Sequence, residues 1–214
     1  MGLPRDYYSW TWGDALFVTL DPYWHSSGAV DNVAGVLVAD DQAGGGKKGG
    51  TASNGKATDL WKVGIGDEQY AWLKKTLETS KAKYKFVFAH HVLGTGRGAV
   101  EISTNYEWGG KDPKGTSTFA AERPNWELPI HDLMVKHGVN IFFQGHDHIF
   151  VTQERDGIIY QSMPNPADDT FSLFNDTAYK SGTKAPNSGH VRVTVTPAEA
   201  KVEYFLAARS KDTA

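Results

Sequence analysis

Many of the apolar residues in this chain lie in short runs of the length and composition of β-strands. Aromatic and small polar residues alternate over residues 7–12, and a second strand-like run covers residues 15–20. Gly13 and Asp14 separate the two runs and favour a tight turn. The pattern predicts a β-hairpin near the start of the chain.

The first helix is predicted over residues 67–80. Tyr70, Leu73 and Leu77 share one face of that segment, and two acidic residues occupy its first turn. Acidic groups there interact favourably with the helix dipole, and the apolar stripe gives the helix a face to bury.

A βαβ unit is predicted in the middle of the chain. An apolar strand over residues 84–90 is followed by a long connection over 92–125, a helix over 126–137 and a second apolar strand over 139–143. Gly138 is well placed to end the helix. Strands joined in this way are parallel, with a right-handed crossover.

The remaining strands are expected to be antiparallel. Residues 149–154 and 158–161 flank the turn pair Asp156-Gly157, and residues 190–196 and 201–206 form a second predicted hairpin. A polar loop is expected over 162–189. The whole pattern predicts an α+β fold with a mixed β-sheet and flanking helices.

The composition is that of an ordinary globular protein. The chain has 214 residues, of which 40% are hydrophobic and 22% charged, and it fits a single domain over residues 1–214. Residues 43–50 are mostly glycine and lysine and predict a mobile surface loop.

Charge and cysteine content narrow the chemistry. The net charge is −3, so neither a nucleic acid nor a membrane is indicated as a partner. No apolar run approaches the roughly 20 residues needed to span a bilayer. No signal peptide is recognisable at the start of the chain, and the sequence leaves the compartment open. Cysteine is absent, which leaves His, Asp, Glu and Asn as candidate metal ligands.

Histidines follow two of the predicted parallel strands directly. His90 and His91 come after the first strand, and the sequence Gly145-His146-Asp147-His148 comes after the second. Ligands collect at the C-terminal ends of parallel strands, and imidazole suits zinc, iron, manganese and copper. Gly145 is expected to allow a sharp turn that aims both following rings at one point. The sequence therefore predicts a metal site, although each histidine taken alone also fits a polar turn.

Roles within this site differ from residue to residue. Side chains alternate along a strand, so only one of His90 and His91 is expected to face the metal unless the chain turns there. The other then serves as a neighbouring group, a phosphate contact or a general acid. Arg97 follows in a glycine-rich loop and fits either a substrate anion or solvent. The candidate metal ligands are His90, His146 and His148, and the candidate catalytic residues are His91, Arg97 and Asp147.

The order of motifs in this chain resembles the calcineurin-like metallophosphoesterase superfamily, which includes the purple acid phosphatases. That order is a strand ending in His-His, a helix, a strand ending in Gly-His-x-His, and a β-hairpin. The resemblance implies a β-sandwich fold and hydrolysis of a phosphoester by a metal-activated water. It also implies that His90 and His146 share one metal and that His148 binds a neighbouring one. The family's metals are usually zinc, iron or manganese, with one or two expected here.

The resemblance covers only the C-terminal half of the family pattern. The family's first half contributes Asp-x-His, Gly-Asp-x-x-Asp and Gly-Asn-His-Asp/Glu, and none of these is present. A lone half would expose a sheet face, so we expect a homodimer or association with an N-terminal half. A metal- or ligand-binding fragment without catalysis is the alternative. A β-lactamase-type zinc hydrolase fits less well, because His-x-His-x-Asp-His is absent.

Overall fold

The computed structural model of the chain describes residues 5–25, 60–93, 96–173 and 175–207. The predicted mobile segment, residues 43–50, lies outside these ranges, so its mobility stays a prediction. Within the described ranges, every helix is too short or too polar to cross a lipid bilayer.

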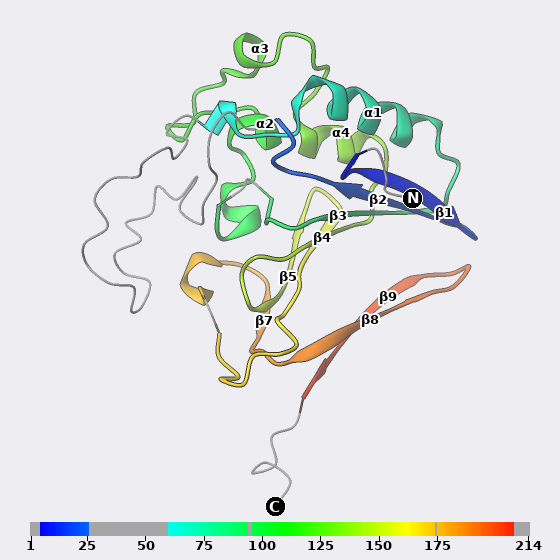
Figure 1. The fold of residues 1–214 in the computed structure, drawn as a ribbon, viewed down its shortest axis with the longest axis vertical. Helices are drawn as coiled ribbons and strands as arrows, with labels where there is room; N and C mark the ends of the chain where they lie inside the picture. Colours follow the sequence, from blue (N-terminus) through cyan, green and yellow to red (C-terminus); the bar gives the residue numbers. More distant parts are fainter. Residues whose placement is uncertain (1–4, 26–59, 94–95, 174, 208–214) are drawn as a thin grey trace, which may run out of the picture.

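The chain has an α+β fold built on one mixed sheet of seven strands, ordered β1-β2-β3-β4-β6-β5-β7, and a separate sheet of two strands, β8 and β9 (Figure 1). The strands are β1 Tyr8–Trp12, β2 Ala15–Leu20, β3 Tyr84–Ala89, β4 Ile141–Gln144, β5 Phe150–Arg155, β6 Ile158–Ser162, β7 Thr183–Ala185, β8 Gly189–Val195 and β9 Ala200–Leu206. The helices are α1 Gly66–Thr79, α2 Tyr106–Gly109, α3 Phe119–Glu122 and α4 Ile130–Lys136, with short 3-10 turns at Leu60–Lys62, Ala99–Ile102 and Asp176–Ala178.

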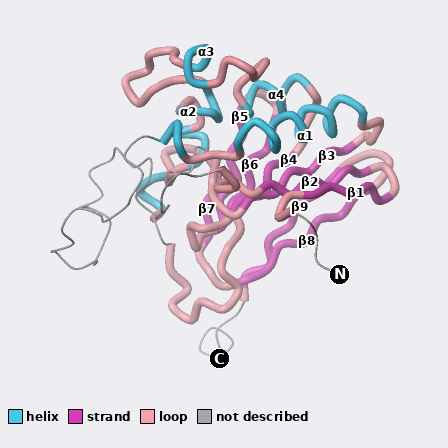
Figure 2. Tube along the Cα trace, turned by 45° about the horizontal axis from the view of Figure 1, so that its top comes forward, coloured by secondary structure: helices cyan, strands magenta, loops and turns pink. Residues whose placement is uncertain are grey.

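The elements form three layers. Helices α1 and α4 cover one face of the large sheet, and the β8–β9 hairpin crosses the opposite side (Figures 1 and 2). Successive strand residues point to opposite faces, so the central strands β2, β3 and β4 supply side chains to two separate cores. Leu16, Val18 and Val87 point to the helices, where they meet Leu73 of α1 and Leu133 of α4.

The opposite face of the sheet is largely aromatic. Rings stack across neighbouring strands from Trp10 to Phe17, then to Phe88 and Phe143. Ala200 and Val202 of β9 pack against this core, together with other partly buried residues. The cover is incomplete toward the edge of the sheet, because Trp10 is 42% exposed and Trp12 is 79% exposed.

The structure confirms most of the predicted strands and the parallel pairing of β3 with β4. Helix α4 begins at Ile130 rather than at residue 126, because a proline at position 129 disfavours helical geometry in the residue before it. The expected loop over 92–125 contains α2 and α3, and the expected loop over 162–189 contains β7.

The pairing of β6 corrects the prediction that all remaining strands are antiparallel. Strand β6 forms the predicted hairpin with β5 but also pairs with β4 in parallel. Strands β2, β3, β4 and β6 therefore form a parallel block at the centre of the sheet, and their C-terminal ends lie along one edge.

A buried carboxylate ties α2 to the start of α1. Glu107 is fully buried, accepts a 3.0 Å hydrogen bond from the Ile65 N–H and lies 3.3 Å from a guanidinium nitrogen of Arg123. A Cβ atom at Gly64 would stand 2.1 Å from its Oε2, so any side chain at position 64 would displace this carboxylate. Burial raises the pKa of Glu107 to about 7, although Arg123 and the Ile65 N–H oppose that shift.

Candidate metal centre

The ends of β3 and β4 bring the predicted histidines together. Ala89 and Gln144 are paired at the last position of the two parallel strands, so the residues that follow them leave the sheet side by side. The Gly145 N–H donates a 2.9 Å hydrogen bond to the carbonyl of His90. This contact fixes the distance between the two histidine-bearing segments.

Three imidazole rings converge at this point. His90, His91 and His146 each offer one ring nitrogen, and these nitrogens all lie within 4.8 Å of one another. The rings of His91 and His146 stack with centroids 3.9 Å apart, and His90 meets both at steep angles. Strand β3 ends at Ala89 and the chain bends at His90, so the alternation expected of a strand does not separate His90 from His91.

The sharp backbone geometry lies at His146 rather than at Gly145. His146 has a φ of 68°, in the left-handed region that non-glycine residues rarely adopt. Gly145 has a different role, because a Cβ atom there would stand 3.1 Å from the His90 carbonyl oxygen. The absence of a side chain at Gly145 permits close approach, and the left-handed residue directs the imidazole of His146 toward His90 and His91.

Two ring nitrogens in the cluster are buried without a hydrogen-bond partner among the described residues, namely Nδ1 of His91 and Nε2 of His146. Burial, with repulsion from the neighbouring histidines and Arg97, lowers the pKa of His91 to about 3. Burial, with Arg97 and His90, lowers the pKa of His146 to about 4. Both rings are therefore neutral at pH 7, with lone pairs free to bind a metal. The residues present fit a transition metal.

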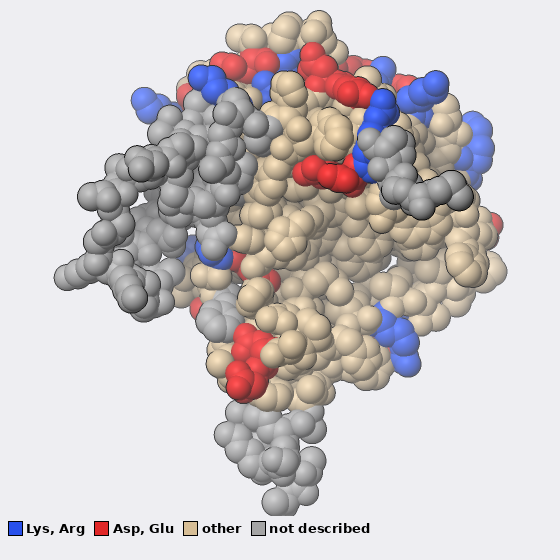
Figure 3. Space-filling view, in the orientation of Figure 1, with Lys and Arg blue, Asp and Glu red and all other residues tan. Residues whose placement is uncertain are grey.

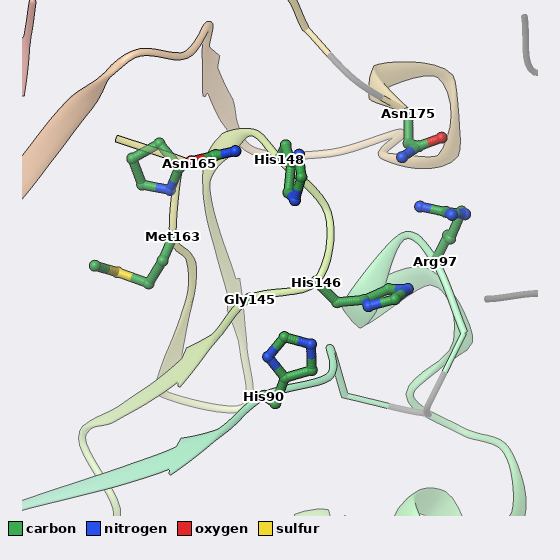
Figure 4. Close-up of a pocket in the computed structure, with 9 residues that line it drawn as sticks. His90, Arg97, Gly145, His146, His148, Met163, Asn165 and Asn175 are labelled. Carbon is green, nitrogen blue, oxygen red and sulfur yellow. The ribbon is translucent and has the colours of Figure 1, made fainter. Parts of the chain in front are cut away.

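A cavity of about 540 Å³ opens beside the cluster (Figure 4). His90 and His146 form part of its wall, and His148 lines it as well without belonging to the three-histidine cluster. Its remaining lining residues are Arg97, Gly145, Met163, Pro164, Asn165 and Asn175. The cluster and the lining contain no carboxylate among the described residues.

Asp147 is predicted to be a catalytic residue, and the structure places its side chain behind the cavity wall. Its side chain is fully buried and does not line the cavity, although His146 and His148 on either side of it do. The carboxylate accepts hydrogen bonds from Arg97, from the Tyr179 hydroxyl at 2.8 Å and from Asn175 at 3.2 Å. Burial raises its pKa, and these donors oppose the shift. These hydrogen bonds anchor the turn that carries His146 and His148.

Arg97 lies where a substrate contact is expected. It lines the cavity, its side chain is 15% exposed, and one guanidinium nitrogen pairs with Asp147. A guanidinium carries five N–H donors, so the pairing leaves others to bind an anion in the cavity.

Sequence reasoning missed the residues that complete the site from the far side. Asn165, Asn175 and Tyr179 belong to the segment that was expected to be a polar loop. No periodicity or motif distinguishes them in the sequence. Only the tertiary structure identifies them, because the fold places that segment against the Gly-His-Asp-His turn.

No protein-family model matches the chain, and no curated protein sequence matches it. Among solved structures, the chain is similar to GAP50, the anchor in the inner membrane complex of Plasmodium, with 12% identity and a TM-score of 0.49 over 94% of this chain and 50% of that one. It is similar to purple acid phosphatase PPD1 from yellow lupin (Lupinus luteus) seeds, with 17% identity and a TM-score of 0.47 over 95% of this chain and 32% of that one. It is also similar to PhoD, with 16% identity and a TM-score of 0.47 over 92% of this chain and 40% of that one. The chain thus spans half or less of the length of these proteins.

Proposed function

We propose that the chain is a metal-dependent phosphoester hydrolase of the calcineurin-like kind. The observation that carries this proposal is the convergence of His90, His91 and His146 beside a cavity that also contains Arg97. Three neutral imidazoles form an open ligand set that leaves room for water or substrate. Phosphomonoesters, diesters and triesters are all candidate substrates.

Each residue has a distinct part in this proposal. His90, His91 and His146 hold the metal, and His148 on the cavity wall binds a second metal or contacts the substrate. A metal bound there would lower the pKa of a water molecule and polarise a phosphoryl oxygen. Arg97 binds phosphoryl oxygens through the N–H groups that Asp147 does not use, and Asn165 and Asn175 orient the ester through amide hydrogen bonds.

The donor set limits the choice of metal. The chain has no cysteine, so the site offers imidazole nitrogen without thiolate sulfur. Imidazole donors suit zinc and iron better than manganese, which prefers carboxylate oxygens, and we propose one or two zinc or iron ions per site.

A non-catalytic metal- or ligand-binding role is the second candidate. It is favoured by the absence of any carboxylate from the histidine cluster and the cavity lining in the described part of the chain. Metal-dependent phosphoesterases with two ions commonly hold them with a bridging carboxylate. On this alternative, the histidines bind an ion that does not activate water for hydrolysis.

The experiment that separates the two candidates uses the purified chain. Zinc, manganese and iron are titrated in turn, and hydrolysis of an aryl phosphomonoester, diester and triester is followed by release of the phenol. Turnover that requires metal and disappears in His146→Ala supports the hydrolase. Stoichiometric metal binding without turnover supports the second candidate. Absence of metal binding contradicts the hydrolase and the metal-binding form of the second candidate, and leaves only binding of another ligand.

We further propose that the aromatic face of the sheet is covered in the functional assembly by a second copy of the chain or by a separate N-terminal half. Trp10 and Trp12 of edge strand β1 are exposed, and the rings behind them continue the stack to Phe17. Charged side chains gather over the helices at the top of the view, while the middle of this side of the molecule is mostly uncharged (Figure 3). Exposed apolar rings such as those of Trp10 and Trp12 favour association.

A further inference from the structure

The turn that carries His146 and His148 is short of internal support. Asp147 N–H donates to the Gly145 carbonyl at 2.8 Å, and Ile149 N–H donates to the Asp147 carbonyl at 2.9 Å. Each of these hydrogen bonds joins residues only two positions apart. His146, between Gly145 and Asp147, is in the left-handed conformation. A turn of this kind needs a side-chain anchor to hold one conformation. Asp147 supplies it, because its carboxylate points into the protein.

Tyr179 provides the most deeply buried of the three donors to that carboxylate. Its side chain is 1% exposed and its hydroxyl donates to Asp147 Oδ2 at 2.8 Å. Arg97 and Asn175 bond to the other carboxylate oxygen, Oδ1. The hydroxyl of Tyr179 therefore fixes the rotation of the carboxylate that the other two donors leave undetermined.

The ring of Tyr179 is itself held firmly. It packs in a small apolar core with Val92, Ala99, Ile149 and Val151, directly behind the histidine-bearing segments. A hydroxyl fixed by its ring in this way loses little conformational entropy when it binds a carboxylate. Tyr179 does not line the cavity, so it touches neither a substrate nor a metal in the site.

We infer that Tyr179 is a positioning residue for the metal site. Acting through Asp147, it holds the backbone of His146 in the left-handed conformation, which directs the imidazole of His146 toward His90 and His91. In this way it sets the metal affinity. This inference rests on the metal-binding part of the proposed function and is independent of hydrolysis. Groups that hydrogen-bond a metal ligand directly change metal affinity by about 10- to 100-fold when removed. Tyr179 acts one residue further from the ligands, so we expect an effect at the lower end of that range.

The test is the variant Tyr179→Phe, which removes the hydroxyl and keeps the ring. Tyr160→Phe is its matched control, because Tyr160 is also fully buried and its hydroxyl makes a 2.5 Å hydrogen bond, to Nδ1 of His131 away from the cluster. Co²⁺ is titrated into both variants and the wild type, and the affinity and the visible absorption spectrum are recorded. Thermal unfolding of the metal-free proteins is measured in parallel.

Tyr179→Phe is expected to weaken Co²⁺ binding by about tenfold and to change the spectrum, which reports ligand geometry. Tyr160→Phe is expected to lower the melting temperature without either change. Unaltered affinity and spectrum in Tyr179→Phe, or an equal effect of Tyr160→Phe, overturns the inference. Failure of the wild type to bind Co²⁺ overturns the inference together with the proposed function, whereas binding without turnover affects the hydrolase proposal alone.

A second variant keeps the inference testable if Tyr179→Phe does not fold. Asp147→Asn preserves the side-chain volume but removes the charge that receives the three donors. It is expected to weaken Co²⁺ binding and to change the spectrum in the same direction. A folded Asp147→Asn protein with wild-type affinity overturns the inference.

Discussion

The imidazole rings of His91 and His146 stack with their centroids 3.9 Å apart and their planes 22° from parallel. The two residues follow different strands, and each has a buried ring nitrogen without a hydrogen-bond partner among the described residues. Leaving a buried polar atom unsatisfied costs roughly 1–3 kcal/mol, so a ligand that binds these two nitrogens would stabilise the protein. A metal ion bound at the cluster would satisfy both nitrogens by accepting a lone pair from each ring.

Substituting His146 by Ala is expected to remove most of the bound metal, because His146 contributes one of the three converging nitrogens. Elemental analysis of the purified protein measures the loss. His190→Ala is the control, since His190 stacks on Phe205 in the β8–β9 hairpin. Unchanged metal content in His146→Ala would exclude the assigned site.

His91→Ala is expected to lower the metal content more than His148→Ala does. His91 belongs to the converging cluster, whereas His148 lines the cavity outside it. The sequence alone predicted the opposite, with His148 as a ligand and His91 as a catalytic group. Elemental analysis of the two variants side by side decides between the two ligand sets, and a greater loss in His148→Ala would restore the one predicted from sequence.

His146→Gly is expected to be more stable than His146→Ala by roughly 1 kcal/mol in the metal-free protein. The reason is the φ of 68° at this position, which glycine adopts without the steric cost that a Cβ atom brings. Urea unfolding in the presence of a chelator measures the difference. Equal stability of the two variants would mean that position 146 is not left-handed in solution.

Glu107 is expected to make the stability of the protein depend on pH. Its pKa is raised from about 4.5 in the unfolded chain to about 7 in the folded protein. The folded state therefore binds a proton more tightly than the unfolded state. The resulting stabilisation is fully present below pH 4.5 and is lost as the pH rises through 7, with a magnitude on the order of 3 kcal/mol.

The matched variant for this prediction is Glu107→Gln, which keeps an oxygen to accept the hydrogen bond from Ile65. The difference in free energy of unfolding between wild type and variant is measured from pH 5 to pH 8 in the presence of a chelator. The wild type is expected to lose stability relative to Glu107→Gln as the pH rises. A difference that is constant with pH would show that Glu107 titrates alike in both states.

Replacing Trp10 and Trp12 together by Ser is expected to weaken self-association of the chain. Both indoles belong to the incompletely covered aromatic face, and their exchange removes apolar surface worth about 25 cal/mol per Å² when buried. Sedimentation velocity over a range of low concentrations measures the change. Val135→Ser, at an exposed position on α4, is the control. A wild type that stays monomeric at every concentration contradicts the homodimer and leaves the N-terminal half as the partner.

The local elements of this fold were predictable because their signals are local. Helix α1 has its apolar stripe, and Asp156 and Gly157 define the β5–β6 turn. The parallel pairing of β6 with β4 was missed, because it depends on a contact between segments that no turn connects directly. The short strand β7 has a polar sequence and little burial, so its position follows from the strand beside it.

The candidate site likewise has a part that the sequence predicted and a part that it did not. The histidines were predictable because they follow apolar strands, and a strand end is visible in the sequence. The convergence of His91 was not, since it depends on a bend that begins at His90. The roles of Asp147 and Tyr179 were likewise hidden, because a buried hydrogen bond between distant segments leaves no mark in the spacing of residues.

The hydrogen bond from the Gly145 N–H to the His90 carbonyl makes one amide proton a reporter of the whole site. The proton exchanges with solvent only when the two histidine-bearing segments separate, and that separation also pulls His146 away from His90. Bound metal opposes the opening in proportion to its occupancy, so the exchange rate of this single amide should fall as the ion is added. Amides in the β8–β9 hairpin, which carries no part of the cluster, should keep their rates. Occupancy of the site can thus be followed in the backbone, without a chromophore and without a substrate.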